Sequence, residues 1–383
     1  MDELSIKIVQ VTDGEADYNK KPTPKEIKHR KILSSLWSEA QRNAKLPCCM
    51  LCENECSSFC NSHSVPGFTL SRIAENGMVS ESIQNKAPLH EKSLGIARTG
   101  TFKLICETCD NERFQDYENP YSYAKTPTNK MIAQIALKNF LLMIYKRREE
   151  NELYTLLGKK YPHTKAYTDE KVYIGNLDLL EYLSGLKYAQ KAIEKSNEKY
   201  YHLYYYKVLD YVVPYAAQSA ITLISDFEDN VINNPYSLSP KTKMKYVHIA
   251  VFPLKSTSII MLFVENGEKR YGSFFRQFRK LSDEDKLSAI NFIAFSNIEN
   301  VFLNPTLQKK MQENRQFVDV CGLTTDIKAD ISIELEPFPI DCPPEKMLLK
   351  AIEEFSLSKR HTIPNLLSRE YAITNNTIDV KRC

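Results

Sequence analysis

Two matched stretches, CMLC at residues 49–52 and CETC at residues 106–109, carry the strongest structural signal in this sequence. A Cys-x-x-Cys pair in a tight turn points both sulfurs the same way, and two such pairs supply the four thiolates of a tetrahedral zinc site. We therefore expect Cys49, Cys52, Cys106 and Cys109 to bind one structural Zn²⁺. The metal would tie together the two ends of the segment between the pairs.

The cysteines around these pairs leave the ligand set open. Cys48, Cys56 and Cys60 lie close enough in sequence to substitute for a ligand, and Cys56 and Cys60 could hold a second metal or pack in a core. Seven of the ten cysteines fall between residues 48 and 109. In a reducing compartment this clustering favours metal binding over a disulfide framework.

Length and composition indicate a protein of ordinary globular type. A chain of 383 residues predicts two domains or more, and 43% hydrophobic and 26% charged residues are typical of a soluble protein. A net charge of +3 neither requires nor excludes a nucleic-acid partner. The N-terminus, MDELSIKIVQVTDGE, lacks the basic and apolar regions of a signal peptide. No run of 18 apolar residues follows, so we expect a cytoplasmic protein without a membrane partner.

The hydrophobic periodicity predicts an α+β chain in three parts. Residues 1–45 would hold a strand over 5–11 and a basic helix from Lys25 to about Ala44, and residues 46–125 the cysteine-rich module. Residues 126–383 would form a larger α+β domain with long helices and an antiparallel sheet. Its helices are expected over 130–150 and 177–207.

The second half of this larger domain alternates in the manner of strands. We expect strands within 211–224 and over 246–252, 258–264 and 327–335, with a hairpin turn at Asn266-Gly267. Ser282, followed by three acidic residues, predicts a capped helix through about Ser296, and residues 345–355 a last helix.

The cysteine pairs and the residues between them resemble the HNH (ββα-metal) endonucleases, in particular zinc-stabilised ones of bacterial and phage proteins. The resemblance rests on CxxC, then SHSVP at 62–66, then LICETCDN at 104–111, and covers about residues 46–118. It implies an N-terminal zinc-bound ββα-metal module. It also implies that His63 is the general base that activates water against a phosphodiester, and that Asp110 binds a catalytic Mg²⁺ or Mn²⁺.

Two positions depart from the family pattern. Ser62 stands where the family has an acidic metal ligand, and Thr101 lies near the position of the asparagine that orients the histidine. One carboxylate holds Mg²⁺ poorly, so Glu118 and Asp116 are the alternative candidates for a second ligand. For His63 the alternatives are a zinc-binding or core histidine, or a capping residue at the turn of Pro66.

Three clusters of basic and aromatic residues are candidate nucleic-acid contacts, each with a plainer alternative. Lys28, Arg30 and Lys31 belong either to a solvated helix face or to an arm that contacts phosphates. The run KYYHLYYYK at 199–207 either packs at the end of a helix or stacks on bases. Basic residues from Lys269 to Lys280 line either a solvated hairpin or a nucleic-acid contact.

The resemblance therefore implies a metal-dependent DNA endonuclease of the HNH type, such as those that arm bacterial antiviral defence. The C-terminal domain would then recognise substrate, a protein partner or an activator. The alternative is a catalytically inactive zinc-binding module that binds nucleic acid or a protein partner.

Overall fold

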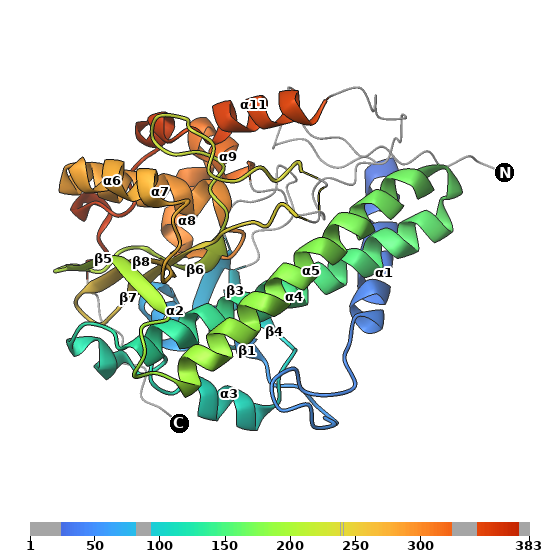
Figure 1. Cartoon of the computed structure of the whole chain (residues 1–383), viewed down its shortest axis with the longest axis horizontal. Coiled ribbons are helices and arrows are strands. Elements are labelled where there is room, and N and C mark those ends of the chain that lie inside the picture. Colours follow the sequence, from blue (N-terminus) through green and yellow to red (C-terminus); the bar gives the residue numbers. More distant parts are fainter. Residues whose placement is uncertain (1–23, 82–92, 238, 240, 324–342, 375–383) are drawn as a thin grey trace.

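One seven-stranded antiparallel sheet organises the chain (Figure 1). The computed structural model describes residues 24–81, 93–237, 239, 241–323 and 343–374. The strand order is β3-β2-β9-β6-β7-β8-β5, and every neighbouring pair is antiparallel. The strands are β2 (Met78–Glu81), β3 (Ser93–Gly95), β5 (Tyr201–Leu209), β6 (Tyr215–Ile221), β7 (Val247–Pro253), β8 (Ser258–Glu265) and β9 (Val301–Leu303). The antiparallel sheet expected from the sequence is present.

Helices cover both faces of this sheet. Successive residues of a strand point to opposite faces, so Ile249 of β7 packs with Phe275 in one core while its neighbour Ala250 packs with Phe140 in another. Burial on both faces explains why the central strands are apolar almost throughout. The helices are α1 (Pro24–Asn43), α2 (Gly67–Ile73), α3 (Glu107–Phe114), α4 (Asn129–Lys160), α5 (Lys165–Glu194), α6 (Gly272–Lys280), α7 (Asp283–Asn297), α8 (Pro305–Gln312), α9 (Arg315–Cys321) and α11 (Pro344–Phe355).

The two longest helices, α4 and α5, lie side by side across one face of the sheet (Figure 1). The Thr128 side chain caps α4 by accepting the N–H of Met131, so the helix begins next to the expected start at residue 130, but it continues to Lys160, beyond the expected end at residue 150. The second helix, expected over 177–207, is wrong at both ends. It runs from Lys165 to Glu194, and the tyrosine-rich run forms the edge strand β5 instead.

The first helix attaches to the far part of α4. Leu36 and Ala40 of α1 share a small core with Leu153 and Leu157 of α4. The strand expected over residues 5–11 lies outside the described residues.

The cysteine-rich segment contributes to the main sheet as well as to its own small one. Strands β1 (Ser62–His63) and β4 (Thr101–Phe102) pair with each other, whereas β2 and β3 join the large sheet through β9. The expected division near residue 125 therefore does not coincide with a break in the sheet.

The C-terminal part follows the sequence-based expectation at some points and departs from it at others. Ser282 caps α7 by accepting the N–H of Asp285, as predicted, and α11 coincides with the expected last helix. Gly267 has a positive φ of 82°, as a tight turn requires, but the chain continues into α6 and no hairpin partner follows. The strand expected over 327–335 lies outside the described residues.

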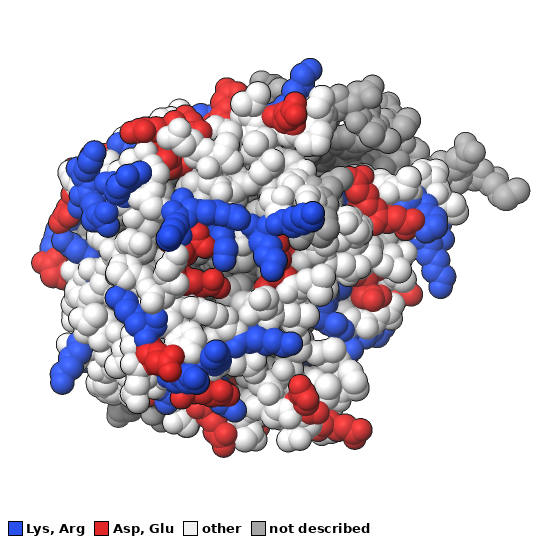
Figure 2. All heavy atoms as spheres, viewed as in Figure 1, with Lys and Arg blue, Asp and Glu red and all other residues white. Residues whose placement is uncertain are grey.

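The visible surface carries acidic and basic side chains intermingled over most of its area (Figure 2). This distribution accords with a net charge of only +3. Within the described ranges, we find no helix with the length and apolar character needed to cross a membrane.

Candidate metal centre

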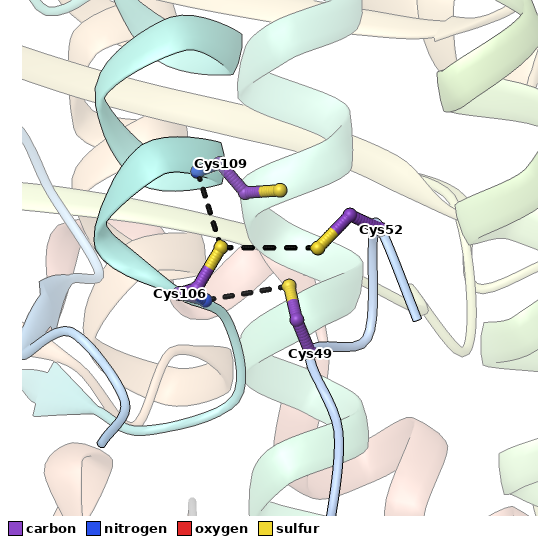
Figure 3. A group of neighbouring side chains, drawn as sticks. All are labelled: Cys49, Cys52, Cys106 and Cys109. Carbon is purple, nitrogen blue, oxygen red and sulfur yellow. Dashed lines mark hydrogen bonds between the residues drawn. The ribbon is translucent and has the colours of Figure 1, made fainter. Parts of the chain in front are cut away.

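The two Cys-x-x-Cys pairs meet in space (Figure 3). The four Sγ atoms of Cys49, Cys52, Cys106 and Cys109 all lie within 4.8 Å of one another. The sulfurs of Cys52 and Cys106 are 3.9 Å apart. Zn–S bonds of about 2.3 Å in a tetrahedron place the sulfurs about 3.8 Å apart. The expected ligand set is thus assembled, and its dimensions are compatible with a structural zinc ion.

Backbone amides around the cluster point at the sulfurs. The N–H groups of Leu51 and Cys106 donate to Cys49 Sγ at 3.5 and 3.3 Å, and the N–H of Cys109 donates to Cys106 Sγ at 3.4 Å. Cys106 is also the N-cap of α3, so its sulfur lies at the positive end of a helix. These donors stabilise thiolates, the form of cysteine that binds metals.

The electrostatics of Cys49 follow from these contacts. Burial acts to raise its pKa, but the amides of Cys52, Cys106 and Leu51 outweigh burial and lower the pKa to about 7. Burial raises the pKa of Cys109, and the neighbouring thiols add to this effect. A bound cation would favour the thiolate at both positions.

The neighbouring cysteines do not join the cluster. Among the described residues, the four-sulfur group is the one set of three or more cysteine, histidine and carboxylate side chains close enough to share an ion. The backbone of Cys48 forms an isolated antiparallel β-bridge with that of Glu55. The thiol of Cys60 donates a hydrogen bond to the carboxylate of Asp110 at 3.5 Å. Burial and the charge of Asp110 raise the pKa of Cys60 to about 11. Cys60 is therefore a neutral thiol near neutral pH.

Asp110 and Glu118, the two carboxylates expected around a catalytic ion, both form ion pairs with one lysine. The ammonium of Lys138 on α4 lies 2.8 Å from Oδ1 of Asp110 and 3.1 Å from Oε1 of Glu118. It also donates to Ser62 Oγ at 2.8 Å, and Ser62 in turn donates to Asp110. Asp110 and Ser62, at positions that the resemblance assigns to metal ligands, and the candidate ligand Glu118 thus surround a side-chain cation.

The environment of this lysine is closed. The side chain of Lys138 is 0% exposed, and that of Asp110 is 15% exposed. The ring of Phe114 lies 3.7 Å from the ammonium, so a cation–π contact adds to the ion pairs. Although burial acts to raise the pKa of Asp110, the charge and hydrogen bond of Lys138 and the hydrogen bond of Ser62 outweigh it, and the pKa is lowered. Asp110 is therefore ionised at neutral pH.

His63 lies beside this cluster in the chain but has a separate set of contacts. Its strand β1 pairs with β4 so that His63 is opposite Thr101, and its Nε2 is 3.0 Å from the carbonyl oxygen of Ile96. Ser62 points to Asp110, and adjacent strand residues point to opposite faces. None of the contacts found among the described side chains joins His63 to Asp110 or Lys138.

The basic residues of the first helix are described in part. Lys31 is exposed on α1, and the side chains of Lys28 and Arg30 lie outside the described part.

The role of Lys138 was not predicted from the sequence, although its position on the helix gives an indication. Lys138 follows Gln134 by four residues and Ile135 by three, on the buried face of a strongly apolar helix. A lone lysine at such a position is buried only with a partner.

No protein-family model, curated protein or solved structure matches this chain.

Proposed function

We propose that the four-cysteine cluster binds one structural zinc ion and that the chain is a zinc-stabilised nucleic-acid-binding protein without a catalytic divalent ion. The observation that carries this proposal is the contact of Lys138 with both Asp110 and Glu118. Zinc in the cluster would supply folding free energy, because the four thiolates come from two segments that the metal joins.

Two properties of the buried ammonium argue against a metal at its position. Mg²⁺ requires near-octahedral oxygen ligands at about 2.0–2.1 Å, and the oxygens here are arranged at hydrogen-bond distance around nitrogen. A metal cation close to Lys138 would also be repelled by the ammonium, because a buried site screens charges less than water does. The lysine already neutralises one of the two carboxylates without any ion.

Nucleic acid as the partner is supported by the resemblance of the zinc-bound scaffold to nucleases and by basic surface residues. A scaffold that has lost its catalytic ion can keep the contacts to the phosphate backbone, which provide most of the sequence-independent affinity.

A metal-dependent endonuclease of the HNH type is the second candidate, and a specific arrangement favours it. Strand β1, which carries His63, pairs with β4, and α3, which carries Asp110, is the next element after β4 in the chain. His63 is half-buried and not closed off from solvent. If Lys138 moved away, Asp110 and Glu118 would face a common point.

A cleavage assay separates these candidates. The zinc-loaded protein is incubated with plasmid and linear DNA in Mg²⁺ or Mn²⁺, beside His63→Ala, and binding is followed in parallel by gel shift. Retarded but intact DNA with both proteins supports the proposal. Metal-dependent cleavage by the wild type that His63→Ala abolishes would establish the nuclease instead.

A further inference from the structure

Two stretches that are far apart in sequence lie against each other at one edge of the sheet. The tyrosine-rich strand β5 is the edge strand, and helix α6 packs over it. The ring of Tyr204 stacks on Phe275 with a centroid distance of 3.8 Å and an interplanar angle of 4°, and Tyr205 meets Phe278 edge-on at 5.2 Å. The aromatic run thus anchors α6 to the sheet.

A bulge in β5 makes this double anchor possible. The register with β8 shifts between Leu203 and Tyr205, so one residue of β5 is extra. Adjacent residues of a regular strand would face opposite ways, but Tyr204 and Tyr205 both pack against the core that contains α6. The position of α6 over the edge is therefore fixed by two neighbouring rings.

The outer face of α6 is basic. Phe274, Phe275 and Phe278 are buried, whereas the remaining long side chains, Arg276, Arg279 and Lys280, are exposed. Residues three and four apart share one helix face, which places the three cations together. Figure 2 shows basic side chains gathered over the position of α6, at the upper left of the view. Among the described residues, none of the three forms an ion pair.

The basic face continues onto β5. Burial lowers the pKa of His202, and the charges of Lys199 and Arg279 lower it further, which places both cations near this edge residue. Lys269 is exposed in the turn before α6. These residues together make one surface, which we call the α6–β5 face. It consists of Arg276, Arg279 and Lys280 on α6, Lys269 in the turn, and Lys199 and His202 at the strand edge.

Among the described residues, neighbouring acids pair with cations other than Arg276, Arg279 and Lys280. Asp283, at the start of α7, is 2.7 Å from Lys207 and 3.6 Å from Lys286. Asp285 pairs with Arg360 and His361. Glu284 is the one residue of this acidic turn that faces solvent without such a partner in the described structure.

We propose that the α6–β5 face is the surface that binds the phosphate backbone of nucleic acid. This inference rests on the proposed function and gives it a location. Arginines with no internal partner match phosphate oxygens by paired N–H donors, and α6 is held rigidly because its three phenylalanines are buried. Lys28, Arg30 and Lys31 would be at most auxiliary contacts.

Fluorescence anisotropy with labelled single-stranded and duplex DNA of random sequence tests the assignment. The variant Arg276→Gln/Arg279→Gln/Lys280→Gln removes three charges from the face. A matched control, Lys159→Gln/Lys160→Gln/Lys309→Gln, removes three exposed charges from α4 and α8. We expect the first variant to bind at least about tenfold more weakly, with a salt slope reduced by about 2 to 3, and the control to remain within about twofold of wild type.

The outcomes separate the surface from the proposed function. Equal weakening by both triple variants, or none by the first, would overturn the α6–β5 face while leaving nucleic-acid binding in place. Absence of binding to any nucleic acid by wild type would overturn both, as would binding to phosphatidylserine vesicles alone. Circular dichroism checks the fold. If the triple variant unfolds, Arg279→Gln alone should still reduce the salt slope by about 1, and an unchanged slope would overturn the face.

Discussion

The ammonium of Lys138 lies 2.8 Å from a carboxylate oxygen of Asp110, and the two residues join α4 to the helix that carries the second cysteine pair. The lysine side chain is fully buried, whereas the side chain of Asp110 is partly exposed to water. This contact connects the helix of the cysteine cluster to the main body of the protein.

Loss of the buried cation should destabilise the protein strongly. Lys138→Met keeps the size of the side chain but leaves Asp110 buried without its cation, and removal of one partner from a buried pair costs about 3 to 5 kcal/mol. Urea unfolding measures the change. In the double variant Lys138→Met/Asp110→Asn the uncompensated charge of Asp110 is gone and that of the more exposed Glu118 remains, so part of the stability should return. Equal stability of Lys138→Met and wild type would contradict the structural role of the pair.

Zinc content should be one ion per chain, and it should depend on the four clustered cysteines. Cys106→Ser is expected to lose zinc and to unfold at a lower temperature, since metal binding and folding are coupled. Cys56→Ser is the matched control because Cys56 lies outside the four-sulfur group, and it should keep its zinc. Atomic absorption and thermal unfolding provide the two readouts. A stable wild-type protein purified without metal would count against the cluster as a zinc site.

Acidification should destabilise the protein through His248, which lies in the core between α4 and the sheet. Burial lowers its pKa to about 3, against about 6.5 in the unfolded chain. Between these values the unfolded state binds more protons, so stability is present above pH 6.5 and is lost as the pH falls. Relative to His248→Gln, wild type should lose about 2 kcal/mol between pH 8 and pH 5. Parallel pH profiles of the two proteins would argue against a neutral buried imidazole.

Close packing of α4 and α5 should make Gly185 intolerant of a side chain. A Cβ atom at Gly185 would lie 2.3 Å from Cζ of Phe140, and overpacking of this kind costs about 1 to 3 kcal/mol. A Cβ at Gly67 would meet nothing within 4 Å, so Gly67→Ala should be close to neutral. Chemical denaturation of the two alanine variants tests the contrast, and equal stabilities would refute the packing of these helices.

Helices could be predicted from the sequence where a capping residue and the apolar pattern after it both favour a helix. Thr128 and Ser282 both cap helices, because a hydroxyl followed by a helical apolar pattern provides both the acceptor and the buried face. The cysteine cluster could be predicted for a similar reason, since each pair is local and four thiolates have one common use.

The remaining features depend on contacts between distant segments. The sequence of the tyrosine run alone predicts the continuation of a helix, whereas in the fold this run pairs with β8 as a strand. The turn residues before α6 predict a hairpin, so the helix that follows them was not expected. The role of Lys138 depends on Asp110, which belongs to another segment of the chain. The sequence pattern named Asp110 and Glu118 as candidate ligands of an ion, whereas both contact a lysine that no local pattern connects with them.

Binding of Mn²⁺ followed by electron paramagnetic resonance tests the central claim most directly. The zinc-loaded wild type is titrated with Mn²⁺ beside Asp110→Asn. If Lys138 serves as the cation of this cluster, free Mn²⁺ should remain in solution to the same extent with both proteins. Stoichiometric Mn²⁺ binding by the wild type that Asp110→Asn abolishes would contradict the account.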